Sequence, residues 1–187
     1  MKNLILFLLM FSGISIIAQE THTIDFEDPG TGADWEWIMD QNGTNPPLEF
    51  VANPASGGIN TSATVAKFTA LQSGQPWALT YTDDDGQFEF DATNNIVKIM
   101  VYKEVSSPVA VKFEGLSPAA EIQITNTLTG QWEELTFDFS AFNGNTYSRL
   151  IVIPDFEPRT QDNIIYFDNI QVPDGEPVGP LPEPTDA

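Results

Sequence analysis

The sequence contains no cysteine and only one histidine, His22, among its 187 residues. Without cysteine the fold has no disulfide framework, no thiolate ligand for a metal and no lipid-bearing cysteine behind a signal sequence. His22 stands near the start of the chain with no nucleophile motif around it. We therefore find neither a Ser/His/Asp nor a Cys/His arrangement for nucleophilic catalysis.

Basic residues are scarce as well: seven lysines and arginines stand against 27 aspartates and glutamates, a net charge of −20. Phosphate binding needs a basic surface, so this balance argues against nucleic acid as a partner. A polyanionic polysaccharide is disfavoured for the same reason, unless calcium bridges the charges. Binding a polyanion would need basic residues to cluster, and the candidates are Lys98, Lys112, Arg149 and Arg159. Of these, we expect Lys98 and Lys112 to share an outward sheet face.

Sustained helical periodicity is absent from the chain after residue 18, and short β-type runs alternate with turn clusters instead. The expected strands cover residues 48–51, 65–70, 77–81, 88–90, 96–103, 109–113, 121–125, 134–139, 150–153 and 163–172. Many short strands at this spacing predict an all-β fold, either a sandwich or a barrel.

The two ends of the chain differ from the middle in composition. Residues 1–18 combine a short basic head with an apolar run that is too short to span a membrane, which predicts a secretory signal peptide cleaved after Ala18. The alternative is a buried N-terminal helix. Residues 174–187 are rich in proline, glycine and acid and predict a linker to a possible further domain. We expect one domain over residues 19–173, a monomeric module of a longer secreted or cell-surface protein that is not inserted in the membrane.

One acid, Asp168, lies in the middle of the apolar run 163–172. An ionised carboxylate in such a strand costs several kcal/mol unless a partner or a metal ion compensates it. At the other end of the domain, residues 23–28 alternate apolar and acidic side chains and include Glu27. If the first and last strands are neighbours, Glu27 and Asp168 would hold one structural Ca²⁺, which accepts several carboxylate and carbonyl oxygens with tolerant geometry.

A set of motifs follows the same order along the chain: Asp25-Phe26-Glu27, Asn60-Thr61-Ser62, Val65-Ala66-Lys67-Phe68, the stretch from Gln131 to Ser140, and Phe167-Asp168-Asn169-Ile170. Together they resemble the jelly-roll carbohydrate-binding modules of the galactose-binding-like superfamily, which occur in secreted and surface glycan-utilisation proteins of bacteria. The resemblance spans Thr23 to Val172 and implies a β-sandwich jelly roll of two antiparallel sheets. It also implies a calcium held by Glu27, Asp168 and oxygens of residues 60–67.

Aromatic side chains are the candidates for contact with a sugar, whose apolar face stacks on a ring while its hydroxyl rim needs hydrogen bonds. Trp35 and Trp37 point the same way in an extended segment, and they either contact ligand or insert into the core. Trp77 opens a strand after a loop, and we expect it to contact ligand. Tyr102 lies on the polar face of its strand. For Trp132, we expect packing in the core.

These features predict a non-catalytic carbohydrate-binding module for a neutral polysaccharide, preferably a β-glucan such as laminarin. The candidate carbohydrate-binding residues are Trp35, Trp37, Trp77, Tyr102 and Arg159, and the candidate calcium ligands are Glu27 and Asp168. One alternative is a structural or adhesion domain that uses the same aromatics as an apolar patch. The other is a glycoside hydrolase, which needs only two carboxylates, although no acid lies in a recognisable glycosidase context.

Overall fold

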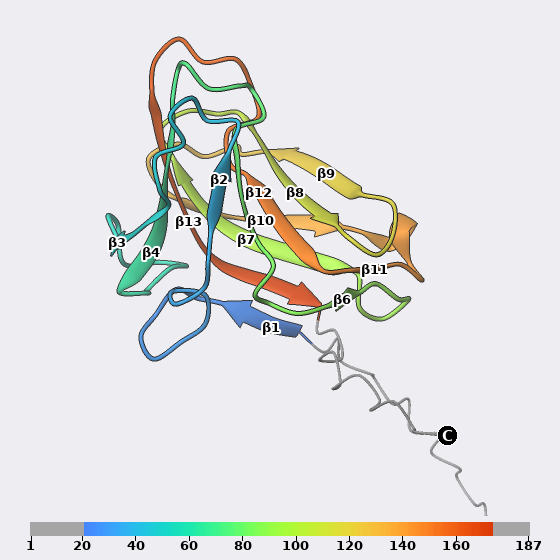
Figure 1. The fold of residues 1–187 in the computed structure, drawn as a ribbon. Helices are drawn as coiled ribbons and strands as arrows, with labels where there is room; N and C mark the ends of the chain where they lie inside the picture. Colours follow the sequence, from blue (N-terminus) through green and yellow to red (C-terminus); the bar gives the residue numbers. More distant parts are fainter. Residues whose placement is uncertain (1–20, 174–187) are drawn as a thin grey trace, which may run out of the picture.

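The computed structural model describes residues 21–173 and consists of two antiparallel β-sheets packed face to face (Figure 1). This part of the chain contains no α-helix, only a short 3-10 helix, η1, at Ser140–Phe142. Within it, no helix has the length and hydrophobicity to cross a membrane. The expected signal peptide and linker lie outside the described residues.

The first sheet, here called sheet 1, has the strand order β10-β7-β13-β4-β3, with β1 also paired to β13. Its strands are β10 (Trp132–Asp138), β7 (Ile96–Lys103), β13 (Asn163–Pro173), β4 (Thr64–Ala70), β3 (Glu49–Ala52) and β1 (Thr21–Ile24). The long strand β13 pairs with β4 through residues 163–167 and with β1 through residues 170–173. Asp168 and Asn169 lie between these two pairings, where the ladder is interrupted.

The second sheet, here called sheet 2, has the order β2-β5-β12-β8-β9. Its strands are β2 (Ile38–Asp40), β5 (Leu79–Thr82), β12 (Arg149–Ile153), β8 (Pro108–Glu114) and β9 (Ala120–Thr125). A two-stranded ribbon of β6 (Phe88–Glu89) and β11 (Thr146–Tyr147) completes the fold. Apart from this ribbon, the arrangement is the predicted sandwich of two antiparallel sheets.

The core lies between the sheets and follows the strict alternation of strand side chains. In β7, the β-branched residues Val97, Ile99 and Val101 are buried in the core, while the intervening Lys98, Met100 and Tyr102 face outward, as predicted. Aromatic rings fill one end of the core, where Phe90 and Phe139 stack at 5.0 Å between ring centroids and both lie edge-on to Phe113. Burial of this apolar surface supplies the main driving force for folding.

The first and last strands are neighbours, which confirms that part of the prediction: β1 pairs antiparallel with β13, and Ile24 lies opposite Ile170 (Figure 1). This pairing brings the segment that follows β1 close to the interruption at Asp168. The position of Glu27 relative to Asp168 is therefore set by backbone hydrogen bonds between the two ends of the domain.

Trp132 is buried as expected, with 6% of its surface exposed, but it does not lie between the two sheets. It precedes the inward-facing Leu135 by three positions, so the two side chains point to opposite faces of β10. Its ring lies 5.8 Å from that of Tyr102 on the outer face of sheet 1. Its indole Nε1 donates a hydrogen bond to Asn53 Oδ1 at 3.1 Å.

Candidate functional site

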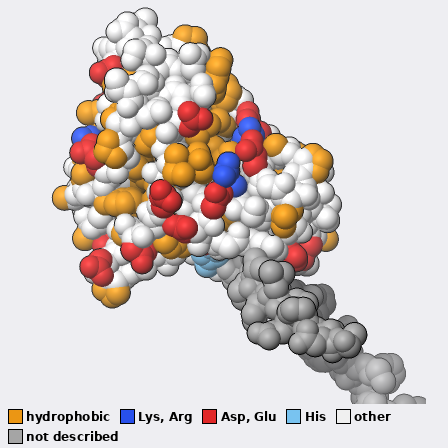
Figure 2. All heavy atoms as spheres, viewed as in Figure 1, with side chains coloured by type: hydrophobic (Ala, Val, Ile, Leu, Met, Phe, Trp, Pro, Cys, Tyr) orange, Lys and Arg blue, Asp and Glu red, His pale blue; other side chains and the backbone are white. Residues whose placement is uncertain are grey.

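A row of side chains crosses the outer face of sheet 2, one from each strand. The cross-strand register places them in the order Ile38, Tyr81, Ile151, Lys112 and Glu121. Between them along the strands lie buried inward-facing residues, so the row points away from the core. Figure 2 shows a face of the molecule on which apolar side chains lie among acidic ones, with each basic group beside an acid.

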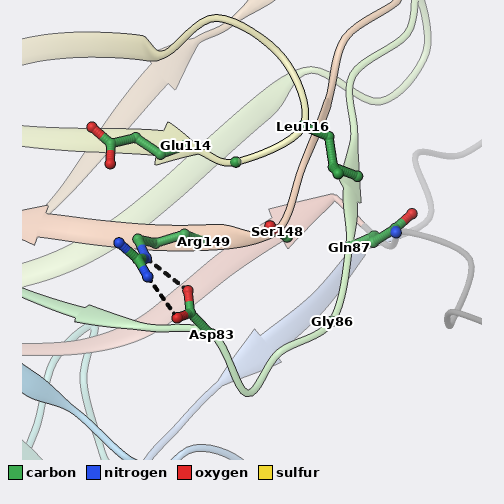
Figure 3. Close-up of a pocket in the computed structure, with 8 residues that line it drawn as sticks. Asp83, Gly86, Gln87, Glu114, Leu116, Ser148 and Arg149 are labelled. Carbon is green, nitrogen blue, oxygen red and sulfur yellow. Dashed lines mark hydrogen bonds and ion pairs between the residues drawn. The ribbon is translucent and has the colours of Figure 1, made fainter.

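Tyr81 is held in place by Arg149, whose guanidinium carbon lies 4.2 Å from the ring centroid. The same guanidinium makes two hydrogen bonds to Asp83, Nε to Oδ1 and Nη2 to Oδ2, both 2.7 Å (Figure 3). This bidentate contact lowers the pKa of the Asp83 carboxyl and raises that of Arg149. The three side chains therefore form a fixed surface with one aromatic ring, fork-shaped donors and a carboxylate.

Leu79 continues this surface along β5. It precedes Tyr81 by two positions, strand alternation directs both side chains to the same side, and both pack against Ile151 and Ile153. Trp77, which was expected to open this strand, lies in the turn before it and is 44% exposed. The result is an apolar strip along β5.

At the other end of the strip, a pocket of about 470 Å³ opens beside Arg149. The residues that line it are Asp83, Gly86, Gln87, Glu114, Gly115, Leu116, Ser148 and Arg149. In Figure 3, Leu116 and Gln87 lie across the pocket from the Asp83–Arg149 pair. An apolar side chain surrounded by carboxylate, amide and guanidinium groups suits a ligand with hydroxyl groups. Gly115 has φ +121°, and a Cβ there would meet Ser148 Oγ at 2.3 Å.

Every lysine and arginine between residues 21 and 173 has an acidic oxygen within 4.0 Å. The pairs are Lys67–Glu49, Lys98–Glu134, Lys103–Asp155, Lys112–Glu114, Arg149–Asp83 and Arg159–Asp155. The expectation that Lys98 and Lys112 share one face is wrong, because β7 belongs to sheet 1 and β8 to sheet 2. No cluster of unpaired cations therefore exists in the described residues.

Arg159 was expected to contact carbohydrate, and the structure contradicts this expectation. Its side chain is 1% exposed, and its guanidinium donates to the backbone oxygens of Leu71, Gln75 and Asp155. These bonds connect the β12–β13 loop to the β4–β5 loop. Because Gln75 lies two positions before Trp77, Arg159 supports the segment that presents this tryptophan rather than contacting a ligand itself.

Trp35 and Trp37 point the same way, as predicted, with ring centroids 6.4 Å apart and planes 23° apart. Both are half-buried against the core. Trp37 also contacts Phe26 at 5.6 Å between centroids and donates from Nε1 to the Gly32 oxygen at 2.9 Å. These contacts favour the alternative in which the pair closes the edge of the core.

Tyr102 lies on the outer face of sheet 1, on the side of the sandwich opposite to Tyr81. The structure therefore does not bring the predicted carbohydrate-binding residues together. It also identifies a candidate contact residue that the sequence analysis did not name, Tyr81. The alternation of Leu79 and Tyr81 was visible in the sequence, but nothing in it indicated which face of this strand is exposed.

Glu27 and Asp168, the predicted calcium ligands, both contact the segment 60–64. Glu27 Oε1 accepts hydrogen bonds from the backbone N–H groups of Ala63 at 2.6 Å and Thr64 at 3.1 Å. Asp168 Oδ2 accepts one from Asn60 Nδ2 at 2.8 Å. The loop implied by the resemblance therefore lies against both acids.

Asp168 is fully buried, and its Oδ1 has no hydrogen-bond partner. Burial raises the pKa of its carboxyl to about 6, and the negative charge of Glu27 adds to the rise. Across residues 21–173 there is no group of three or more His, Asp or Glu side chains able to hold a metal ion. A cation at Glu27 and Asp168 would therefore take its other ligands from carbonyl, amide or water oxygens, which is usual for calcium.

Comparisons with known proteins found similarity at the level of the fold. No family model matches the chain, and no curated protein sequence matches it. Among solved structures, a mutant of the carbohydrate-binding module CBM29-2 is 9% identical, with a TM-score of 0.53 over 87% of this chain and 99% of that one. Another CBM29-2 mutant, complexed with cellulohexaose, is 9% identical, with a TM-score of 0.51 over 83% and 92%.

A third solved structure, TmCBM61 in complex with β-1,4-galactotriose, is 15% identical, with a TM-score of 0.48 over 81% of this chain and 95% of that one. At these identities the similarity to CBM29-2 shows a common fold. The predicted jelly-roll sandwich of carbohydrate-binding modules is thus confirmed.

Proposed function

We propose that this chain is a non-catalytic carbohydrate-binding module whose sheet 2 outer face binds a neutral polysaccharide, preferably a β-glucan such as laminarin. The observation that carries the proposal is the fixed surface of Tyr81, Arg149 and Asp83 beside an open pocket. The fold supports it, because a module of the same fold was solved with cellulohexaose. From the composition of residues 1–18, we also propose that the module acts outside the cell or at its surface.

Binding on this face combines an apolar contact with directed hydrogen bonds. The C–H face of a sugar ring rests against Tyr81 and Leu79, which removes apolar area from water on both sides. Hydroxyl groups at the rim donate to Asp83 and accept from Arg149. Because these two side chains already hold each other in place, little side-chain entropy is lost when the ligand binds.

The pairing of all six basic side chains between residues 21 and 173 favours an uncharged ligand. A uronate or sulfate group would have to compete with the carboxylates that already neutralise Arg149 and Lys112. It would also approach a strongly acidic protein, and salt screening leaves repulsion at direct contact largely in place. A neutral chain uses the same donors and acceptors without separating any ion pair.

The protonation of the site supports binding without catalysis. A glycosidase needs a general acid whose pKa is raised. The pKa of Asp83 is instead lowered by Arg149. Among the carboxyl groups of residues 21–173 with a shifted pKa, only that of Asp168 rises. Asp168 is buried in sheet 1 and does not face the sheet 2 surface.

We further propose that Glu27 and Asp168 hold one structural calcium together with oxygens of the segment 60–64. The unpartnered, fully buried Oδ1 of Asp168 fits this role, because such an atom is costly without a proton, a donor or a cation. Calcium would supply the charge that lets both carboxylates remain ionised. The ion would then fasten the interruption of β13 to the β3–β4 loop.

Affinity electrophoresis of the full chain against neutral and anionic polysaccharides tests the function. We expect retardation by laminarin or another neutral glucan, and none by alginate or a sulfated galactan. Tyr81→Ala should reduce the retardation, and Tyr81→Phe, which keeps the ring, should retain most of it. Retardation by the anionic polymers alone, or no retardation by any polysaccharide, would contradict the proposal.

A further inference from the structure

A second row of side chains crosses the opposite side of the sandwich. The register of sheet 1 places Trp132, Tyr102, Tyr166, Lys67 and Glu49 side by side, one from each of its five successive strands. The residues that flank them in β7 and β13 are buried, so the row faces outward. Three aromatic side chains thus stand on three adjacent strands of an outer face.

The aromatic side chains of this row are held in place by Trp132 at one end. Trp132 is almost fully buried, and its Nε1 is bound by Asn53, whose own Nδ2 donates to Asn60 Oδ1 at 3.1 Å. Tyr102 lies edge-on between its neighbours, with ring centroids 5.8 Å from Trp132 and 6.0 Å from Tyr166. Both tyrosines are half-buried. Trp132 therefore supports the row, and Tyr102 and Tyr166 present it to solvent.

A hollow adjoins the two tyrosines at the ends of the same strands. It has a volume of about 220 Å³ and is lined by Glu104, Val105, Gln161, Asp162, Asn163 and Ile164. Burial raises the pKa of the Tyr102 hydroxyl, and the Glu104 carboxylate beside it raises that pKa further. Because side chains alternate along a strand, Ile164 shares the face of Tyr166. Ile164 is 46% exposed. The hollow offers carboxylate and amide groups beside an apolar side chain and two aromatic rings.

The charged side chains of this face favour a neutral ligand. Lys67 Nζ lies 2.7 Å from Glu49 Oε2, and Lys98 Nζ lies 2.9 Å from Glu134 Oε1, so both cations are neutralised. The hollow adds Glu104 and Asp162 without a further cation. A polyanion would be repelled here. A neutral polyhydroxyl chain would stack on the tyrosines and use the paired charges as donors and acceptors.

We propose that the outer face of sheet 1, centred on Tyr102 and Tyr166, is a second saccharide-binding surface for a strand of the same neutral polysaccharide. The inference rests on the proposed function and extends it, because one module then holds two glycan strands on opposite faces. A module with two sites cross-links long chains and binds them with an avidity that exceeds either affinity alone.

Calorimetric titration of the full chain with a neutral β-glucan hexasaccharide, such as laminarihexaose, tests this surface. The wild type should bind two oligosaccharides, and Tyr166→Ala and Tyr81→Ala should each bind one. Loss of the ring should weaken its own surface roughly 5- to 150-fold, the scale of removing one stacking platform. Tyr166→Phe keeps the ring and should retain both sites. With long laminarin, the wild type should form turbid complexes, whereas either alanine variant should not.

The outcomes separate the two proposals. A stoichiometry of one in the wild type, abolished by Tyr81→Ala and unaffected by Tyr166→Ala, overturns the second surface and leaves the first. Absence of binding by the wild type to any neutral glycan overturns both. Thermal melting identifies a variant that fails to fold. If Tyr166→Ala does fail, the exposed substitution Ile164→Asn takes its place and should selectively weaken the same surface.

Discussion

Glu27 and Asp168 bind opposite ends of one short segment, residues 60–64. Glu27 accepts hydrogen bonds from the backbone N–H groups of Ala63 and Thr64, and Asp168 accepts one from the side-chain amide of Asn60. The segment that follows the first strand, the last strand and an intervening loop thus meet where β13 leaves β4 and begins to pair with β1. Oδ1 of Asp168, a buried carboxylate oxygen without a hydrogen-bond partner, lies at this junction.

Calcium removal should destabilise the domain. An ion that binds only the folded state adds RT ln(1 + [L]/Kd), about 2.7 kcal/mol at a hundredfold excess over Kd. Thermal melting with calcium and with a chelator measures the effect. Asp168→Asn and Glu27→Gln should each abolish the difference. Glu49→Gln, which alters an exposed acid in the Lys67 pair, is the matched control and should preserve it. Identical melting with and without calcium would contradict the metal site.

The metal-free domain should become less stable as the pH rises through 6. Burial raises the pKa of Asp168 from 3.8 to about 6, so the folded state binds this proton more tightly than the unfolded chain does. The contribution is fully present below pH 3.8 and is lost as the pH rises to about 6, a difference of about 3 kcal/mol.

Denaturant unfolding between pH 4 and 7.5 in the presence of a chelator measures this slope. Subtracting the profile of Asp168→Asn removes the contributions of all other groups, including the His22–Asp85 pair. With calcium the sign should reverse, because the ion requires the ionised carboxylate and its stabilisation grows as the pH rises through 6. A metal-free difference profile that is flat, or that rises with pH, would rule out the assigned cause.

Trp132 and Trp77 should differ sharply in their effect on stability. Trp132→Ala removes a buried ring from beside Tyr102 and the hydrogen bond to Asn53, and should cost about 3 kcal/mol. Trp77 is 44% exposed, and Trp77→Ala should change the free energy of unfolding by less than about 1 kcal/mol. Urea unfolding of the two variants compares them directly. A Trp132→Ala protein as stable as the wild type would overturn the supporting role given to this ring.

Binding of the neutral ligand should respond little to salt. Aromatic stacking and hydroxyl hydrogen bonds carry no net charge, and all six basic side chains of residues 21–173 are already paired. Raising the salt concentration from about 0.01 to 0.15 M shortens the Debye length from about 30 to about 8 Å. We expect the Kd for laminarin to change less than about twofold over this range. Calorimetry at the two ionic strengths gives the result, and a steep loss of affinity would show that charge drives binding.

The fold was predictable because its local patterns agree with one another. Period-two alternation correctly assigned the faces of β7, and β1 and β13 are neighbours, as the calcium hypothesis required. Alternation alone does not show which sheet a strand joins. Lys98 and Lys112 were therefore placed on one face, although their strands lie in different sheets.

The candidate site was less predictable because it depends on contacts between segments far apart in the sequence. Arg159 is buried because carbonyl groups of the β4–β5 loop accept its donors, and no local pattern around residue 159 indicates them. The surroundings of Tyr81 could not be predicted either, because Arg149, which contacts its ring and Asp83, lies far away in the sequence. The pair Trp35 and Trp37 allowed two interpretations, and the contact with Phe26 favours the structural one.

The central claim is that Tyr81 lies at the centre of a surface for neutral polysaccharide. Equilibrium depletion of the wild type and Tyr81→Ala proteins by an insoluble β-glucan, in the presence of saturating laminarihexaose or without it, tests this claim most directly. Loss of the ring should weaken binding at the sheet 2 surface by about 1–3 kcal/mol, and the free oligosaccharide should release the wild type. Equal, competitor-sensitive binding of both folded proteins would contradict the account.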